Sequence, residues 1–169
     1  YVIGLETDCC FHFEVAADLF DERTLTLLRK APPGRIQLEA GLQSFNQPTL
    51  DAVARKTSLS AAERNLRYLL EGGNIHIHVD LIAGLPYETL EIFKQSFNRA
   101  YAVGAHMLQV GFLKLLHGST LRAQAEALGL HFCDSPPYEI ISSPWLSGED
   151  LHKIKLTEHA LEHCSNSAR

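Results

Sequence analysis

The sequence predicts an α/β fold in which about four parallel βα units form part of a TIM-type barrel, followed by a small C-terminal extension. Two observations predict it. Strand-like and helix-like segments alternate at intervals of roughly 30 residues, and polar residues stand near the end of each strand-like run. Because about four units cannot close an eight-stranded barrel, the sheet should have open edges, and these favour self-association.

The first half of the chain alternates strand-like and helix-like segments. In order it predicts a strand at Phe11–Val15, a helix at Asp21–Lys30, a strand at Arg35–Gly41, a helix at Thr49–Arg55 and a helix from Ser60 to Leu70. Asp21 is the expected N-cap of the first helix, because its carboxylate can accept hydrogen bonds from backbone amides. Ser60 and Glu63 have the spacing of a capping box, and Gly72 and Gly73 stop that helix.

The second half continues the alternation and then changes character. It predicts a strand from Ile75 through Asp80, a helix at Thr89–Tyr101, a strand at Met107–Lys114, a helix at Ser119–Leu128, a short β-prone piece at Glu139–Ser142 and a helix at Ser147–His163. The change in pattern predicts two units, a partial barrel over residues 1–130 and a C-terminal extension over residues 131–169.

Composition excludes several classes of protein. A net charge of −5 without a basic cluster argues against a nucleic-acid partner. No apolar run reaches the roughly 18 residues of a membrane span, and no secretion signal is visible. We therefore expect a cytoplasmic protein that acts on a small molecule. The four cysteines, which show no disulfide or zinc spacing and are expected to be buried or incidental thiols, are Cys9, Cys10, Cys133 and Cys164.

Polar residues near the carboxyl ends of the predicted strands are the candidates for chemistry, because the loops beyond those ends form the ligand crevice of such folds. Following the four strands in order, they are Glu14, then Glu39 with Gln43 and Ser44, then Asp80, then Lys114 with His117. Any one of them alone could be a solvated or capping residue. Together they predict a polar row along one rim of the sheet.

The order of these residues resembles a known family. The segments Gly41–Asn46, Arg55 and Asp80–Pro86 look like the later half of a radical S-adenosylmethionine (SAM) barrel. The likeness covers residues 11–130 and is to the oxygen-independent coproporphyrinogen III oxidases. The phrase Phe11–Asp18 adds a resemblance to the cobalamin-associated Fe-S oxidoreductases.

The resemblance implies roles for individual residues. Glu14 matches the strand-end acid that binds the ribose or amino end of SAM, while Gln43 and Asp80 match contacts to the ribose. Arg55 matches a basic residue at the SAM carboxylate, and Ile82 matches an apolar neighbour of the adenine. The predicted cofactor-binding set is Glu14, Gln43, Ser44, Arg55, Asp80 and Ile82. As alternatives, Arg55 is an exposed helix residue, and Gln43 with Ser44 caps a helix.

One departure from the family is large. Radical SAM enzymes hold a four-iron four-sulfur cluster with a Cys-x-x-x-Cys-x-x-Cys loop, and this chain has no such triplet. The chain is therefore expected to be the C-terminal fragment of a radical SAM oxidoreductase that cleaves SAM reductively. The fragment itself is expected to be inactive. The substrate is unknown, and use of cobalamin by the parent enzyme would depend on an upstream domain.

Two alternatives stay open. His76 and His78 alternate along a strand in the way that metal-dependent hydrolases hold a catalytic metal. A non-catalytic binding module would instead recruit a partner through an open sheet edge or through the terminal helix.

Overall fold

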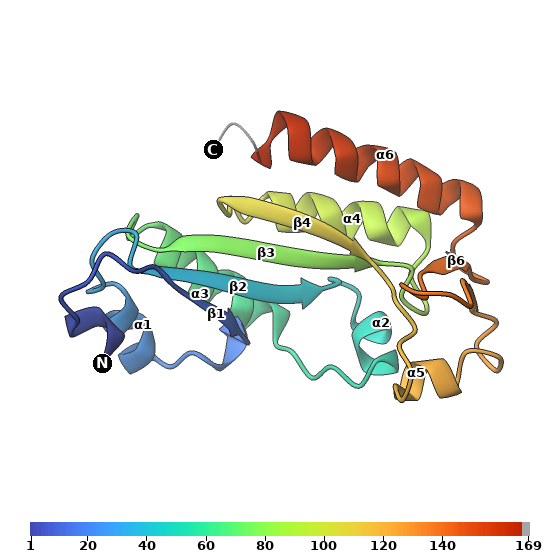
Figure 1. The fold of residues 1–169 in the computed structure, drawn as a ribbon, viewed down its shortest axis with the longest axis horizontal. Helices are drawn as coiled ribbons and strands as arrows, with labels where there is room; N and C mark the ends of the chain where they lie inside the picture. Colours follow the sequence, from blue (N-terminus) through green and yellow to red (C-terminus); the bar gives the residue numbers. More distant parts are fainter. Residues whose placement is uncertain (167–169) are drawn as a thin grey trace.

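A computed structural model describes residues 1–166 and contains one sheet of four parallel strands, with helices against one of its faces (Figure 1). The strands are β1 (Phe11–Val15), β2 (Ile36–Gln43), β3 (His76–Ala83) and β4 (Met107–Phe112), in the spatial order β1-β2-β3-β4. Each strand pairs in parallel with the next one along the chain. The predicted fold class, a partial TIM-type barrel, is confirmed.

The helices follow the predicted order. They are α1 (Glu22–Leu28), α2 (Gln47–Ala52), α3 (Leu59–Leu70), α4 (Leu90–Tyr101), α5 (Thr120–Ala123) and α6 (Gly148–Cys164), with short 3₁₀ turns η1 (Val2–Gly4) and η2 (Ala17–Leu19). Asp21 caps α1 as predicted, because its carboxylate accepts the Thr24 amide at 2.7 Å. A capping box between Ser147 and Asp150 starts α6.

Two helix predictions are wrong in detail. α3 begins at Leu59 after Ser58, so Ser60 is not its N-cap. The Ser58 amide donates to a carboxylate oxygen of Asp18 at 3.0 Å, and this tertiary contact fixes where the helix begins. The helix predicted over residues 119–128 stops at Ala123, because the chain continues in tight turns that end at Gly129 with a φ of 64°.

The two faces of the sheet differ in polarity. Along β2 and β3, alternate residues are buried, and they pack against α3 and α4. The buried residues of these strands are Ile36, Leu38, Ala40, Leu42, Ile77, Val79, Leu81 and Ala83. The opposite face carries Gln37, Glu39, His78 and Asp80, which are all partly exposed. The polar face and the carboxyl ends of the strands are thus left for a site.

The C-terminal extension covers part of the outer edge of β4. Strands β5 (His131–Phe132) and β6 (Ile140–Ser142) form an antiparallel pair, and the Ile140 amide donates to the Leu113 carbonyl at 2.9 Å. After α6, the side-chain amide of Asn166 accepts from the Leu108 N–H at 3.3 Å and donates to the Leu108 carbonyl at 2.9 Å. Within residues 1–166 the outer edge of β1 pairs with no strand.

The extension shares its core with the sheet. Leu146, Leu151 and Ile154 belong to the same cluster of buried side chains as the residues of β2 and β3. The boundary between residues 130 and 131 stays a prediction. No helix within residues 1–166 has the length and apolar character needed to span a membrane.

Candidate functional site

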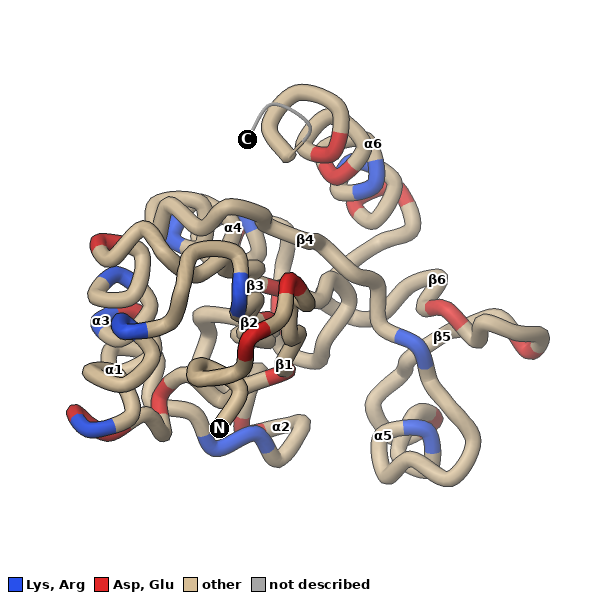
Figure 2. Tube along the Cα trace, turned by 60° about the vertical axis from the view of Figure 1, so that its left-hand side comes forward, with Lys and Arg blue, Asp and Glu red and all other residues tan. Residues whose placement is uncertain are grey.

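A cavity of about 300 Å³ lies at the carboxyl ends of β1, β2 and β3. Its lining residues are Glu14, Val15, Ala16, Glu39, Gly41, Gln43, Arg55 and Asp80. Figure 2 shows that β1, β2 and β3, whose ends form this cavity, lie side by side. The structure therefore brings together Glu14, Gln43, Arg55 and Asp80, four of the six residues in the predicted cofactor-binding set.

The local backbone explains how Gln43 reaches the cavity. The register between β2 and β3 shifts between Gly41 and Gln43, which marks a β-bulge at the end of β2. Gln43 adopts a left-handed φ of 66°, an uncommon conformation for a residue with a side chain. A side chain at position 41 would collide with the Gln43 amide, since an added Cβ would lie 2.4 Å from its Nε2. Glycine at this position makes room for the cavity wall.

Arg55 follows α2 and turns back toward β2. Its backbone N–H donates to the Leu50 carbonyl at 2.9 Å, and its guanidinium donates to the Gly41 carbonyl. The side chain is half-buried rather than an exposed helix residue. One cationic group therefore stands among the carboxylates of the cavity.

Three polar atoms of the cavity wall are buried without a hydrogen-bond partner. They are Oε1 of Gln43, Nε of Arg55 and Oδ1 of Asp80. A buried polar group left without a partner costs on the order of 1–3 kcal/mol, so such groups are rare in folded proteins. All three atoms belong to residues that line this cavity, which makes it the candidate site for a polar ligand.

The electrostatics of the cavity favour a ligand with positive charge or hydroxyl donors. Burial, together with the nearby carboxylates of Glu39 and Glu14, raises the pKa of Asp80 to about 7. Glu14 and Glu39 are direct register partners in β1 and β2. His12 Nε2 lies 3.0 Å from a carboxylate oxygen of Glu39, which makes Glu39 part of a polar chain that continues below the cavity.

Two residues of the predicted cofactor-binding set lie outside the cavity lining. Ser44 is fully buried, and its hydroxyl donates to the carboxylate of Glu88. Ile82 lies two residues beyond Asp80 on the same face of β3 but does not line the cavity. Glu39 is in the predicted polar row but not in the predicted cofactor-binding set, and it lines the cavity. The strand alternation that places Asp80 on the polar face is the sequence signal that also identifies Glu39.

The residues singled out on the fourth strand do not join the site. Lys114 and His117 are exposed and do not line the cavity. The His117 ring lies 4.9 Å from the Tyr138 ring of the extension, measured between centroids. The predicted polar row therefore converges over three strands, not four.

The histidine pair on β3 contacts other side chains of the sheet. The rings of His76 and His78 lie 4.8 Å apart, and the Gln37 amide nitrogen lies 3.1 Å from His78 Nε2. Burial lowers the pKa of His78, and His76 lowers it further. Over residues 1–166, no group of three or more His, Cys, Asp or Glu side chains is placed to hold a metal ion, so the hydrolase alternative gains no support.

The four cysteines are free thiols. Cys9, Cys10 and Cys164 are exposed and Cys133 is half-buried. Of the two expectations for these thiols, buried or incidental, their exposure favours the second.

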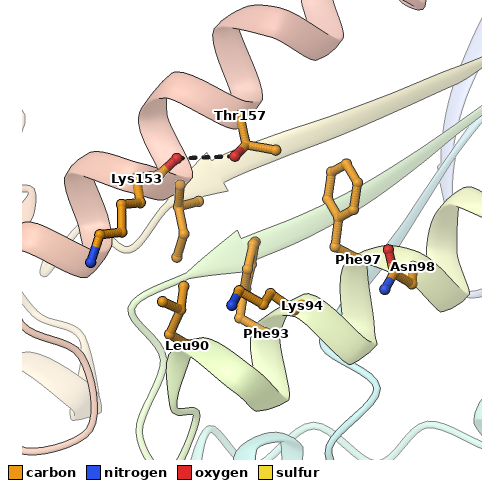
Figure 3. Close-up of a pocket in the computed structure, with 8 residues that line it drawn as sticks. Leu90, Phe93, Lys94, Phe97, Asn98, Lys153 and Thr157 are labelled. Atoms are coloured by element: carbon orange, nitrogen blue, oxygen red, sulfur yellow. Dashed lines mark hydrogen bonds between the residues drawn. The ribbon is translucent and has the colours of Figure 1, made fainter.

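A second cavity, of about 570 Å³, lies between α4 and α6. Leu90, Phe93 and Phe97 point from α4 toward α6, where Lys153 and Thr157 stand on the facing helix (Figure 3). The walls are mainly apolar, and Lys153 is already paired with Glu149 at 3.0 Å. The cavity lies away from the carboxyl ends of the strands and holds none of the predicted site residues.

Solved structures of radical SAM enzymes share the fold of this chain. Coproporphyrinogen III oxidase (HemN) from Escherichia coli, described as a radical SAM enzyme, matches 89% of this chain with a TM-score of 0.65 and 23% identity, over 32% of its own length. Elp3 from Methanocaldococcus infernus matches 70% of this chain with a TM-score of 0.59 and 19% identity, over 28% of its own length. The predicted resemblance to radical SAM enzymes is confirmed at the level of the fold.

A radical SAM methyltransferase is also similar. TsrM from Kitasatospora setae, in a structure with cobalamin and a [4Fe-4S] cluster bound, matches 80% of this chain with a TM-score of 0.61 and 20% identity, over 27% of its own length. A second TsrM structure holds the tryptophan substrate and a SAM analogue. The chain thus spans about a third or less of the length of each of these proteins.

Sequence comparison adds one match, in the extension. Residues 126–169 match the family described as "Protein of unknown function (DUF4080)". No curated protein matches the chain in sequence.

Proposed function

We propose that the cavity at the carboxyl ends of β1, β2 and β3 binds SAM, and that this chain forms the later part of the barrel of a radical SAM oxidoreductase. The observation that carries the proposal is the set of three buried, unpartnered polar atoms, on Gln43, Arg55 and Asp80, that line one cavity. The fold shared with radical SAM enzymes supports the proposal.

The chemistry of the cavity fits the groups of SAM. The Arg55 guanidinium suits a carboxylate, and the acid of Glu14 suits the ammonium group. Gln43 and Asp80 offer acceptors for the ribose hydroxyls. Ile82, which the resemblance places near the base, lies beyond the cavity lining on the same face of β3. When bound, SAM supplies a carbon-centred radical after reductive cleavage of a carbon–sulfur bond. The residues of this chain bind and orient it.

The cysteines of this chain do not fit an iron–sulfur cluster. Cys9 and Cys10 are adjacent, and Cys133 and Cys164 lie in the extension, so the spacing of the three-cysteine loop is absent. We therefore infer that the chain alone binds SAM without cleaving it. The substrate of the parent enzyme and its use of cobalamin stay predictions.

Calorimetric titration of the chain with SAM tests the proposal. Arg55→Ala and Asp80→Asn should each weaken binding about tenfold or more, since a hydrogen bond to a charged group contributes about 1.5–3 kcal/mol. Arg23→Ala, at an exposed position of α1, is the matched control and should bind like the unmodified chain. Absence of SAM binding, or affinities that neither site variant changes, would refute the proposal.

A further inference from the structure

Glu88 is a buried acid that the proposed SAM contacts do not use. It lies in the connection between β3 and α4 and is 0% exposed. Its Oε1 accepts hydrogen bonds from the hydroxyls of Ser44 and, at 3.3 Å, Ser96, while Oε2 has no partner. Among residues 1–166 no positively charged side chain compensates it, and burial raises its pKa to about 7. Burying a carboxyl group in this way is costly, and the cost calls for an explanation.

The two hydroxyls that donate to Glu88 also hold the turn after β2. The backbone N–H of Asn46 donates to the Ser44 hydroxyl at 3.0 Å, and the N–H of Phe45 donates to the Ser96 hydroxyl at 3.0 Å. A hydroxyl that donates its proton to a carboxyl oxygen keeps its lone pairs free to accept these amides. Glu88 therefore makes both hydroxyls donate to its carboxyl group and accept from the amides of the turn.

The same turn is tied to the β3–α4 connection at a second point. The side-chain amide of Asn46 donates to the Tyr87 carbonyl at 3.1 Å and to the Thr49 hydroxyl at 2.8 Å. Residues 44–46 are thus bound to the connection that carries Glu88 and to α4 through Ser96. These bonds hold the segment that immediately follows Gln43.

Gln43 needs such support. Its left-handed φ of 66° costs about 1–2 kcal/mol for a residue with a Cβ, so the surrounding structure must hold it. Its Oε1 is one of the unpartnered atoms of the cavity. A relaxed turn would let Gln43 return to an extended conformation and withdraw its amide from the cavity.

We propose that Glu88 is a positioning residue, which acts through Ser44 and Ser96 to hold Gln43 at the SAM-binding cavity. Its carboxyl group does not line the cavity and acts only through the turn. The inference rests on the proposed function for its ligand. The effect of Glu88 on the turn can be measured without any ligand.

Asn74 provides a matched control. Like Glu88 it is a buried polar residue in a connection, and its side-chain amide donates to the carbonyls of Leu28 and Ala31 at 3.0 and 2.9 Å. It also carries one unpartnered buried oxygen. Because it precedes the amino end of β3, it lies at the end of the sheet opposite the cavity.

The experiment compares Glu88→Leu, Glu88→Gln and Asn74→Leu with the unmodified chain. Hydrogen exchange of the Phe45 and Asn46 amides should accelerate at least about tenfold in Glu88→Leu, and the Kd for SAM should rise about tenfold. Glu88→Gln should restore both quantities to within about threefold of the unmodified chain, because its amide oxygen can still accept from both serines. Asn74→Leu should lower the unfolding temperature without changing either quantity.

The outcomes separate the two proposals. If Glu88→Leu leaves the exchange of both amides unchanged, or if Asn74→Leu changes SAM affinity as strongly, the positioning role is refuted. If the unmodified chain binds no SAM while the exchange differs as expected, the proposed function fails and the role of Glu88 is limited to the turn. If Glu88→Leu does not fold, Glu88→Asp, which draws the carboxyl group back from both hydroxyls and leaves the serines in place, should show the same changes to a smaller degree.

Discussion

Replacement of Gly41 by alanine should weaken SAM binding and leave stability almost unchanged. The new Cβ would lie 2.4 Å from Nε2 of Gln43 and 3.5 Å from the Arg55 guanidinium. Carbon and nitrogen atoms in contact prefer about 3.5 Å, so the Gln43 amide has to move by about 1 Å. The atom that moves is the end of a flexible side chain, and Gly41 has no left-handed φ, so the folded backbone can accept alanine.

The magnitude follows from the hydrogen bond that the displaced amide can no longer make. A neutral hydrogen bond contributes about 0.5–1.5 kcal/mol, which corresponds to a loss of SAM affinity between about twofold and about tenfold. Calorimetric titration and thermal unfolding of the same samples measure the two effects separately.

Gly111→Ala in β4 is the control for this substitution. The atoms nearest to its added Cβ are the Leu81 carbonyl oxygen at 3.7 Å and a carbon of Ile82 at 4.0 Å, which are ordinary contacts. It should bind SAM like the unmodified chain. If Gly41→Ala keeps full affinity, or if Gly111→Ala loses as much, the argument from the cavity wall is wrong.

Two further predictions concern stability. Burial raises the pKa of both Asp80 and Glu88 to about 7. The folded chain therefore holds protons that the unfolded chain releases, and the free energy of unfolding should fall as pH rises from about 4.5 to about 7. Urea denaturation across this range measures the free energy of unfolding at each pH. Its fall with rising pH should be smaller in Glu88→Gln than in the unmodified chain, by at most about 3 kcal/mol. An equal fall in both proteins would contradict the raised pKa of Glu88. Asn166→Ala removes two hydrogen bonds to Leu108 and should lower the free energy of unfolding by about 1 kcal/mol and increase self-association. Unchanged stability together with unchanged sedimentation behaviour would count against this role of Asn166.

Local sequence patterns were sufficient to predict most of the helices and strands. The caps at Asp21 and Ser147 depend on side chains that bond to amides three residues away, so spacing alone identifies them. The start of α3 depends on a contact between Ser58 and Asp18, which are 40 residues apart, and no local pattern contains it. The capping-box spacing at Ser60 therefore gave the wrong helix start.

The candidate site shows the same division. Alternation along β2 and β3 places Glu39 and Asp80 on one face, and the cavity contains both. Ser44 follows the end of β2 and is fully buried. Its partner Glu88 lies 44 residues further along the chain, so the sequence could not reveal what the hydroxyl binds. A strict two-residue period likewise could not predict the β-bulge next to Gln43.

The two edges of the sheet differ in how readily another strand can add to them. Within residues 1–166 no strand pairs with the outer edge of β1, whereas addition of a strand along β4 would compete with the bonds of Asn166 to Leu108 and of Ile140 to Leu113. Strand-forming partners are therefore expected to add on one side only. If so, the chain would lie at the end of a larger sheet, with β4 outermost.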